Sequence, residues 1–270
     1  MKFLRKKQAD SAYYKLKYRL GLALSGGGTR GLAHIGVLRA FEENRIKFDY
    51  VAGTSAGSLV GAMYAAGIPW EQMLEEARTV RRKDIVNAKL FLGSESSNVA
   101  KVADKLLLGK NFNELNLPFC AVAVDISSGN EIVLNSGSVA RAVSASCAVP
   151  ELFKPVELDG MLLVDGGLLN NMPADVCRRM GAEMVIGVDL NHNRGSGAKS
   201  RRLRDTLVAT WNITTKSTMY KGFMNSDLVI EPELSEYKNT SLDNIDAMVE
   251  EGYRATIERM PEIKELLQLR

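Results

Sequence analysis

The sequence predicts an α/β protein with three layers, α/β/α, around a mostly parallel central sheet. Short apolar runs typical of buried strands alternate with helical segments along the whole chain, which is the pattern of repeated strand–helix–strand units. A length of 270 residues and a hydrophobic content of 46% suffice for one buried core. No internal repeat divides the sequence. We therefore expect one domain over residues 19–270, preceded by a basic N-terminal segment, residues 1–18.

The first elements follow each other closely. A strand is expected at residues 18–24, then a glycine-rich turn and a helix over about 29–43. A second strand at 48–52 leads through a tight turn into a helix of small residues at 58–66. An amphipathic helix then begins at Pro69, a residue that is favoured in the first helical turn.

Residues 83–117 interrupt this alternation, because they mix short apolar runs with a Ser/Asn-rich stretch. An irregular insertion of this length predicts a lid or a wall of the substrate site. Beyond it the regular pattern returns. We expect strands at 119–126, 131–135, 160–164, 184–190 and 227–230, and helices at 139–146, from Pro173, at 203–220 and from 242.

Charge and cysteine content exclude several classes of protein. The chain has 35 Lys and Arg against 32 Asp and Glu, a net charge of +3, which is too small to indicate a nucleic-acid partner. Its three cysteines, Cys120, Cys147 and Cys177, are odd in number and widely spaced. This predicts neither a disulfide framework nor a zinc site, and it favours a reducing, cytoplasmic compartment. We expect no metal and no cofactor.

The basic N-terminal segment has two interpretations. The first 19 residues carry seven Lys and Arg against one Asp, with no apolar core of a signal peptide. Peripheral contact with anionic lipid at the inner membrane face would use such a segment. A solvated basic tail explains it equally well.

Gly53-Thr54-Ser55-Ala56-Gly57 is the most informative motif, because it places a serine where a strand turns sharply into a helix. A serine between two glycines at such a turn presents its hydroxyl at the end of the strand. The start of the following helix offers free N–H groups to a developing oxyanion. This nucleophile elbow indicates acyl transfer through a serine ester.

A second glycine-rich turn, Gly26-Gly27-Gly28, follows the first strand, with Arg30 and Gly31 behind it. Its uncovered N–H groups can hold a negative charge, and Arg30 can tether the loop or add positive potential. The same glycines match the G-x-G-x-x-G dinucleotide fingerprint. That interpretation requires an acid at the end of the second strand, whereas Asp49 stands at its start and Ser55 at its end.

Three residues can supply the base. His34 lies one turn into the helix after the glycine loop. His192 follows a strand and comes after Asp165, which allows a Ser55–Asp165–His192 triad in the order that α/β-hydrolases use. Asp165 itself ends a strand and is followed by Gly166-Gly167, at the position where α/β sheets place their sites. An ordinary Asp-Gly-Gly turn would have the same residues.

Taken together, the glycine loop, the elbow and Asp165-Gly166-Gly167 resemble the patatin-like phospholipase family, and most of all its small single-domain bacterial members. The segments 142–153 and Asn171-Met172-Pro173 extend the likeness. It spans about residues 19–190 with five motifs in the family's order, while residues 1–18 and 191–270 carry no motif of the family.

The resemblance implies a Ser–Asp dyad without histidine, with Ser55 as nucleophile and Asp165 as base. It also implies that the N–H groups of Gly27 and Gly28 form the oxyanion hole and that Gly26 shapes the loop. The expected substrate is a lipid or another acyl ester, and the oligomeric state stays open. Some bacterial relatives are regarded as regulators, so a regulatory or scaffold role is the alternative. The supporting positions of the motifs are Arg30, Gly31, Gly53, Gly57, Gly166 and Gly167.

Overall fold

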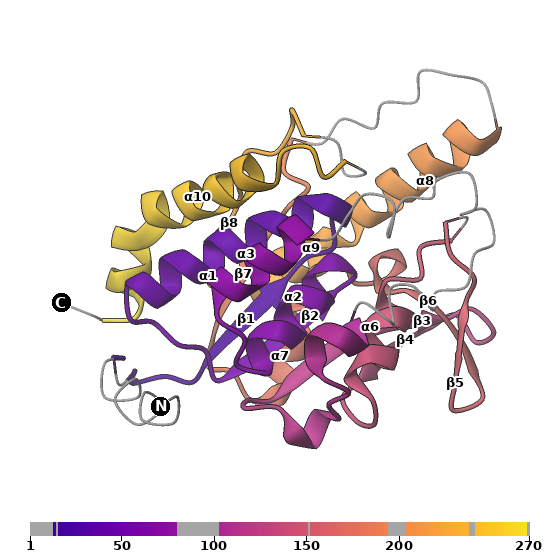
Figure 1. Ribbon diagram of the computed structural model, residues 1–270, viewed down its shortest axis with the longest axis horizontal. Coiled ribbons are helices and arrows are strands. Elements are labelled where there is room, and N and C mark those ends of the chain that lie inside the picture. Colours follow the sequence, from indigo (N-terminus) through magenta and orange to yellow (C-terminus); the bar gives the residue numbers. More distant parts are fainter. Residues whose placement is uncertain are drawn as a thin grey trace.

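One sheet of eight strands with helices on both faces organises the molecule (Figure 1). The computed structural model describes residues 13–14, 16–79, 103–150, 152–193, 203–237 and 241–268. The three-layer α/β/α class predicted from the sequence is confirmed. Residues 1–12 of the predicted basic segment, and the predicted lid before residue 103, lie outside the described residues.

Most predicted elements have a counterpart within a few residues. The predicted helix over 29–43 begins as a 3-10 turn, and the three-residue strand β5 was too short to be predicted. The strands are β1 (Leu20–Leu24), β2 (Tyr50–Thr54), β3 (Phe119–Asp125), β4 (Asn130–Leu134), β5 (Val156–Leu158), β6 (Met161–Asp165), β7 (Met184–Val188) and β8 (Leu228–Ile230). The helices are α1 (Ala33–Glu43), α2 (Ala56–Ala65), α3 (Trp70–Thr79), α6 (Val139–Ser146), α7 (Ala174–Met180), α8 (Leu203–Ser217), α9 (Met219–Asn225) and α10 (Ile245–Leu266), with 3-10 turns η1 (Gly28–Leu32), η2 (Phe112–Glu114) and η3 (Gly166–Leu168).

The sheet is parallel in its centre and antiparallel at one side. The strand order is β5-β6-β3-β2-β1-β7-β8, and β4 also pairs with β3. Strands β3, β2, β1, β7 and β8 all run in the same direction. Strands β4 and β6 run antiparallel to β3, and β5 forms a hairpin with β6.

The pairing register of β3 brings the ends of β2 and β6 together. Strand β2 pairs with residues 119–122 of β3, and β6 pairs antiparallel with residues 123–125. Because β4 pairs with residues 121–125, positions that overlap the partners of both β2 and β6, β2 and β6 must share the other edge of β3. The two strands approach along that edge from opposite directions. The residue pair Thr54↔Val122 ends one ladder and Ala123↔Asp165 begins the next.

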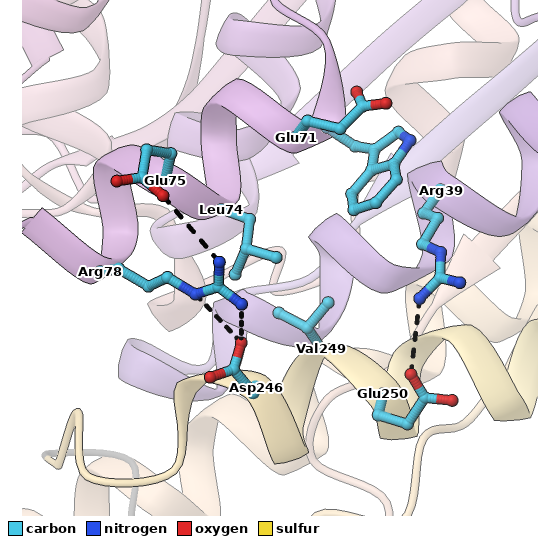
Figure 2. Close-up of a pocket in the computed structure, with 9 residues that line it drawn as sticks. Arg39, Glu71, Leu74, Glu75, Arg78, Asp246, Val249 and Glu250 are labelled. Atoms are coloured by element: carbon cyan, nitrogen blue, oxygen red, sulfur yellow. Dashed lines mark hydrogen bonds and ion pairs between the residues drawn. The ribbon is translucent and has the colours of Figure 1, made fainter.

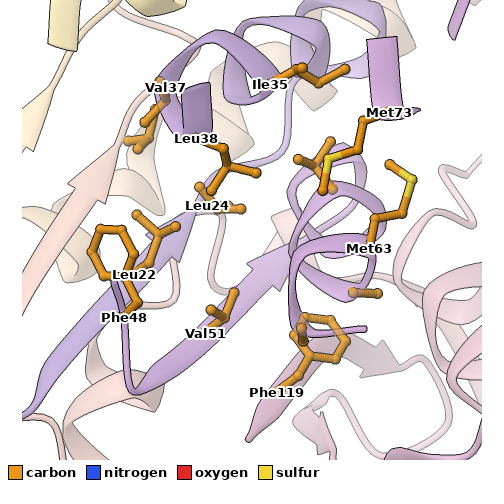
Figure 3. Close-up of a cluster of buried hydrophobic side chains, with 14 of the residues drawn as sticks. Leu22, Leu24, Ile35, Val37, Leu38, Phe48, Val51, Met63, Met73 and Phe119 are labelled. Carbon is orange, nitrogen blue, oxygen red and sulfur yellow. The ribbon is translucent and has the colours of Figure 1, made fainter. Parts of the chain in front are cut away.

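The two faces of the central strands differ in side-chain size. Leu22 and Leu24 of β1 belong to the larger apolar cluster, which includes residues of α1, α2 and α10, and Figure 3 shows them beside Val51 and Phe119 from the neighbouring strands. Ala23 points to the opposite face, into a smaller cluster with residues of α7. At residues 121–123 of β3 the order of sizes is reversed, because Ala121 and Ala123 belong to the larger cluster and Val122 to the smaller one.

Helices α1 and α10 touch through their backbones. A Cβ atom on Gly36 would lie 1.8 Å from the carbonyl oxygen of Val249, and one on Gly252 would lie 1.9 Å from that of Ala33. Both glycines therefore remove side chains at the crossing point. Figure 1 shows α10 lying along α1 on the outer side of the molecule.

Within the described part of the chain, none of the helices is long and apolar enough to cross a bilayer.

The α1–α10 crossing gives a test of the packing. Gly252→Ala should lower the free energy of unfolding by about 3 kcal/mol, because overpacking a rigid contact displaces backbone. Urea denaturation measures this, with Glu258→Ala as the control on an exposed position of the same helix, where a change within about 0.5 kcal/mol is expected. Equal stability of the two variants would show that the helices separate freely.

Candidate active site

Ser55 lies at a strained turn between β2 and α2. Its backbone has φ 53° and ψ −124°, a region that non-glycine residues rarely adopt and that costs about 1–3 kcal/mol. The flanking glycines make the turn sterically feasible. A Cβ on Gly53 would lie 2.3 Å from the carbonyl oxygen of Gly57, and one on Gly57 would lie 2.2 Å from that of Leu24.

Hydrogen bonds from neighbouring elements hold this turn in place. The Ser55 N–H donates to the hydroxyl of Ser146 on α6 at 2.9 Å, and that hydroxyl donates to the Val122 carbonyl oxygen at 2.6 Å. The Thr54 hydroxyl donates to the Asn170 carbonyl oxygen at 2.8 Å. The turn is thus fixed to α6, to β3 and to the chain after η3. Ser146 lies within the segment 142–153 that resembles the family, but the sequence alone assigns it no role.

Asp165 is buried beside Ser55. Its Oδ1 accepts the Gly167 N–H at 2.8 Å, while Oδ2 is buried without a full hydrogen bond among the described residues. Burial raises the pKa of Asp165 to about 7, and the adjacent Ser55 hydroxyl and the Gly167 N–H act in the opposite direction. A carboxylate of this kind is a far stronger base than an exposed aspartate.

The strand that carries Asp165 runs against the expected direction. Sequence reasoning placed this acid at the carboxyl edge of a parallel sheet, but β6 is antiparallel to β3. Asp165 comes close to Ser55 because β2 and β6 end face to face on the same edge of β3. Gly166 makes the approach feasible, since a Cβ there would lie 2.3 Å from the Val122 carbonyl oxygen.

A thiol also adjoins the site. Burial and then the charge of Asp165 raise the pKa of Cys147 to about 12, although contacts with the hydroxyls of Ser58 and Ser55 act the other way. The thiol therefore stays protonated at neutral pH. Because the thiolate is the reactive form of cysteine, Cys147 is a poor nucleophile here.

The glycine loop lies directly against the elbow. A Cβ on Gly26 would lie 3.1 Å from the Ser55 Cβ and 2.6 Å from Oδ1 of Asn171. The Gly26 N–H donates to the Asn171 carbonyl oxygen at 3.1 Å, and Nδ2 of Asn191 donates to the Gly26 carbonyl oxygen at 2.8 Å. Both groups of Gly26 are therefore occupied in holding the loop. Sequence reasoning missed Asn191, although its position just beyond the end of β7 could have indicated it.

Gly27 and Gly28 contribute to the loop in different ways. Gly28 has φ 60°, the left-handed conformation that favours glycine. At Gly27 the missing Cβ points at Leu190, whose Cδ1 would be 2.9 Å away. The sequence implied only that their N–H groups form the oxyanion hole. For Gly27 the structure adds a reason for the glycine itself, which is that the loop must pack closely on Leu190.

Arg30 and Gly31 tie the loop to its surroundings. Arg30 is buried, and its Nε donates to the Tyr237 carbonyl oxygen at 2.9 Å. Burial lowers the pKa of Arg30, and the charge of Glu233 opposes this effect. A Cβ on Gly31 would lie 2.5 Å from that of Ala56, so η1 packs against the first residue of α2. These contacts support the tethering role that the sequence suggested for Arg30.

The two histidines lie in different environments. His34 is fully buried on α1, where its Nε2 donates to the Ser25 carbonyl oxygen at 2.9 Å and desolvation lowers its pKa to about 4. It therefore braces the glycine loop as a neutral ring. His192 is partly exposed, and its Nδ1 lies 2.7 Å from a carboxylate oxygen of Glu231, just beyond β8. Strands β1 and β7 separate β8 from β2, a spacing of roughly 14 Å at about 4.8 Å per strand.

The structure does not favour a dinucleotide site at the glycine loop, because Asp49, the acid that such a site would need, lies elsewhere. The Asp49 carboxylate accepts the Leu20 N–H at 2.7 Å, so it caps the start of β1. The glycine loop follows the other end of that strand. Asp49 therefore lies at the opposite edge of the sheet from any ligand on the loop.

A groove in the described part of the molecule lies away from these residues. It has a volume of about 660 Å³ and lies between α1, α3 and the start of α10. Ion pairs line it, with Arg78 against Asp246 and Glu75 and Arg39 against Glu250, as Figure 2 shows. It contains no nucleophile beside a base. No group of three or more metal-ligating side chains occurs among the described residues.

Comparisons with known proteins point to one family. The sequence model described as patatin-like phospholipase matches residues 22–178. An uncharacterized NTE family protein of Mycobacterium tuberculosis is 32% identical over 90% of this chain and 47% of its own length. Patatin-like phospholipase domain-containing protein 6 of Mus musculus is 36% identical over 82% of this chain and 16% of its own length. The chain thus spans about half the mycobacterial relative and a smaller share of the mouse one.

Solved structures share the fold at low sequence identity. VipD from Legionella pneumophila matches with a TM-score of 0.55 and 15% identity, over 91% of this chain and 67% of that one. The type III effector protein ExoU matches with a TM-score of 0.50 and 14% identity, over 91% of this chain and 53% of that one. At such identity the likeness concerns the fold alone.

The close packing of the glycine loop on the elbow yields a test. Gly26→Ala should lower kcat by about a hundredfold or more, because the new methyl group displaces Ser55 or Asn171 and misplacement of reacting groups by about 1 Å has effects of this size. Initial rates on a soluble short-chain ester measure it. Gly129→Ala in the turn between β3 and β4 is the control for activity, since a Cβ there meets no atom within 4 Å, although its φ of 74° makes some loss of stability expected. Wild-type rates in Gly26→Ala would mean that the loop takes no part in the site.

Proposed function

Because the chain belongs to the patatin-like phospholipase family, we propose that it is a serine acyl-ester hydrolase that acts on lipids through Ser55 and Asp165. The proposal takes residues 19–270 as one acyl hydrolase domain. It assigns the oxyanion hole to the N–H groups of Gly27 and Gly28. Phospholipids or lysophospholipids are the substrate class that the family name supports.

The observation that best supports the proposal is the position of Asp165 Oδ2, which lies buried beside Ser55 without a full hydrogen bond among the described residues. The Ser55 hydroxyl is close enough to lower the pKa of the carboxyl, and Oδ1 already accepts the Gly167 N–H. A buried carboxylate oxygen without a partner is unfavourable for folding. Such an oxygen next to a serine with a strained φ is typical of a general base that accepts the serine proton.

The chemistry then runs in two steps. The Ser55 oxygen attacks the ester carbonyl carbon while its proton passes to Asp165, and the carbonyl oxygen takes the negative charge opposite the glycine loop. The ester C–O bond breaks, the departing alkoxide takes the proton from Asp165, and an acyl-serine remains. Water attacks this acyl-serine by the same route, with Asp165 accepting its proton and returning it to Ser55.

The position of His192 argues against a triad. The imidazole is paired with Glu231 near the edge strand β8, whereas a base must lie within hydrogen-bond reach of the serine. His34 is also unsuited, because its Nε2–H is engaged by the Ser25 carbonyl oxygen. Among the described groups, Asp165 remains the base that neighbours Ser55.

Activity of three variants tests the assignment. Ser55→Ala should lower kcat by about 10⁴-fold or more, as loss of a serine nucleophile does in other hydrolases. Asp165→Asn should be nearly as damaging, because the amide cannot accept the proton. His192→Ala should stay within about tenfold of the wild type. A folded but inactive His192→Ala protein would refute the dyad, and substantial hydrolysis by Ser55→Ala would refute the nucleophile.

The raised pKa of Asp165 predicts opposite effects of pH on activity and on stability. Only the ionised carboxylate is a base, so kcat/KM should rise with pH through the folded pKa of about 7. The unfolded pKa is about 3.9, so between these values the folded state binds more protons. Stability should therefore fall as pH rises through that window.

Asp165→Asn should remove this pH dependence and melt at a higher temperature than the wild type at pH values above the folded pKa. Thermal scans across the pH range measure this, with Ser55→Ala as the inactive control that keeps the carboxyl group. If Asp165→Asn is the less stable variant at high pH, the carboxylate is stabilised by contacts other than those described.

A further inference from the structure

The helical segment α8–α9 carries an unusual share of exposed apolar side chains. Ten large hydrophobic side chains are exposed among the described residues, and half of them belong to these two helices, which have 15 and 7 residues. A soluble protein seldom leaves such side chains together on one element without a partner. The five are Leu207, Ile213, Tyr220, Phe223 and Met224.

Three of these side chains fall on one helical face. The Thr218 N–H donates to the Thr214 carbonyl oxygen at 3.0 Å and Thr218 has helical φ and ψ, so the helical path continues from α8 into α9. Ile213, Tyr220 and Met224 are therefore on the same side, with exposed fractions of 57%, 69% and 66%. The exposed Lys216 lies along the same side. We call these four residues the α8–α9 stripe.

The opposite face of this segment covers the chain that follows Asp165. The Thr218 hydroxyl donates to the Gly167 carbonyl oxygen at 2.8 Å, and Cγ2 of the buried Thr215 would lie 3.1 Å from a Cβ on that glycine. Met219 is buried, and its sulfur accepts from Nδ2 of Asn171 at 3.4 Å. The stripe is therefore separated from the loop beyond Asp165 by about one helix diameter, roughly 10 Å.

Charge in this part of the sequence is strongly one-sided. Residues 194–224 contain seven Lys and Arg and one Asp, whereas the whole chain has 35 basic against 32 acidic residues. Of the basic side chains in this segment, Lys221 is paired with Glu131 and Asp175, while Lys216 is exposed. Apart from this segment the chain is slightly acidic. A basic region combined with an exposed apolar helical face is typical of elements that lie in the interface of an anionic membrane.

We propose that the α8–α9 stripe docks on an anionic lipid surface, with Ile213, Tyr220 and Met224 entering the interface and Lys216 facing the phosphate groups. The inference rests on the proposed function, because it gives Ser55 access to lipid in a membrane. The side chains suit the task, since Tyr and Lys combine an apolar body with a polar end. A second copy of the chain fits less well, because a two-fold contact along the stripe would bring the two Lys216 side chains together.

Vesicle binding in the Ser55→Ala background tests the proposal, because hydrolysis cannot then alter the vesicles. The probe is vesicles of three parts phosphatidylcholine to one part phosphatidylserine, measured by co-sedimentation. The triple variant Ile213→Ser/Tyr220→Ser/Met224→Ser should bind about tenfold more weakly or worse, given the apolar area withdrawn from the interface. Lys216→Glu should weaken binding severalfold on these vesicles and leave binding to pure phosphatidylcholine unchanged.

A matched control removes exposed apolar side chains elsewhere. Leu108 and Ile126 are 83% and 47% exposed, and the double variant Leu108→Ser/Ile126→Ser should bind as its parent does. Circular dichroism checks that each variant is folded. If the triple variant does not fold, Tyr220→Ser alone and Lys216→Glu carry the test, and each should weaken binding.

Three results would overturn the docking surface. The parent protein could fail to bind the vesicles, or the folded triple variant could bind them as tightly as the parent. Light scattering could instead show a dimer that the triple variant converts to monomers while vesicle binding persists, which would make the stripe a contact between copies. Hydrolysis of a soluble ester by the wild type is measured separately, so loss of the proposed function and loss of docking are distinguishable.

Discussion

The shared edge of β3 is the constraint on which the site depends. Strand β4 pairs with residues 121–125 along one edge, so β2 and β6 divide the other between them and end face to face. This arrangement brings together Ser55 and Asp165, which are far apart in the sequence. Gly53, Gly57 and Gly166 then serve the same purpose, because a Cβ on any of them would lie closer than about 3 Å to a backbone carbonyl oxygen. The geometry of the site is thus a property of strand register more than of loop conformation.

The sequence was sufficient to locate the motifs, but not to predict how they are arranged in space relative to one another. The elbow and the glycine loop are local patterns, and a strand followed by a tight glycine turn can be recognised within a dozen residues. The direction of β6 was not accessible in this way, because an antiparallel pairing between distant segments leaves no trace in the residues that flank Asp165. The same limit applies to Gly27, whose packing against Leu190 joins segments separated by most of the chain. His34 braces the site through a contact with Ser25 that its residue type alone does not indicate, whereas Asn191 could have been indicated by its position just beyond the end of β7.

The site is built from features that oppose folding. Ser55 has a backbone conformation that is rare for its residue type, Asp165 is buried with one oxygen unpaired, and His34 is buried with Nδ1 lacking a partner. Each is tolerated because the surrounding core is dense and holds the elements from both faces of the sheet. The apolar layers of α1, α2 and α10 on one side and of α7 on the other are therefore part of the site's support. The stability of the fold and the reactive geometry of the site therefore both depend on the packing of these layers.

The contact between α1 and α10 also bears on how the chain acquires its structure during synthesis. Arg39 and Glu250, which meet across this contact, are separated by 211 positions. While the protein is being made, the apolar face of α1 waits for a helix whose contacting residue is translated 211 positions later. Contacts of such long range slow folding and leave apolar surface open to association. A nascent chain of this kind has a long interval in which a chaperone can shield α1, and the glycine loop at the head of that helix becomes fixed only when the interval ends.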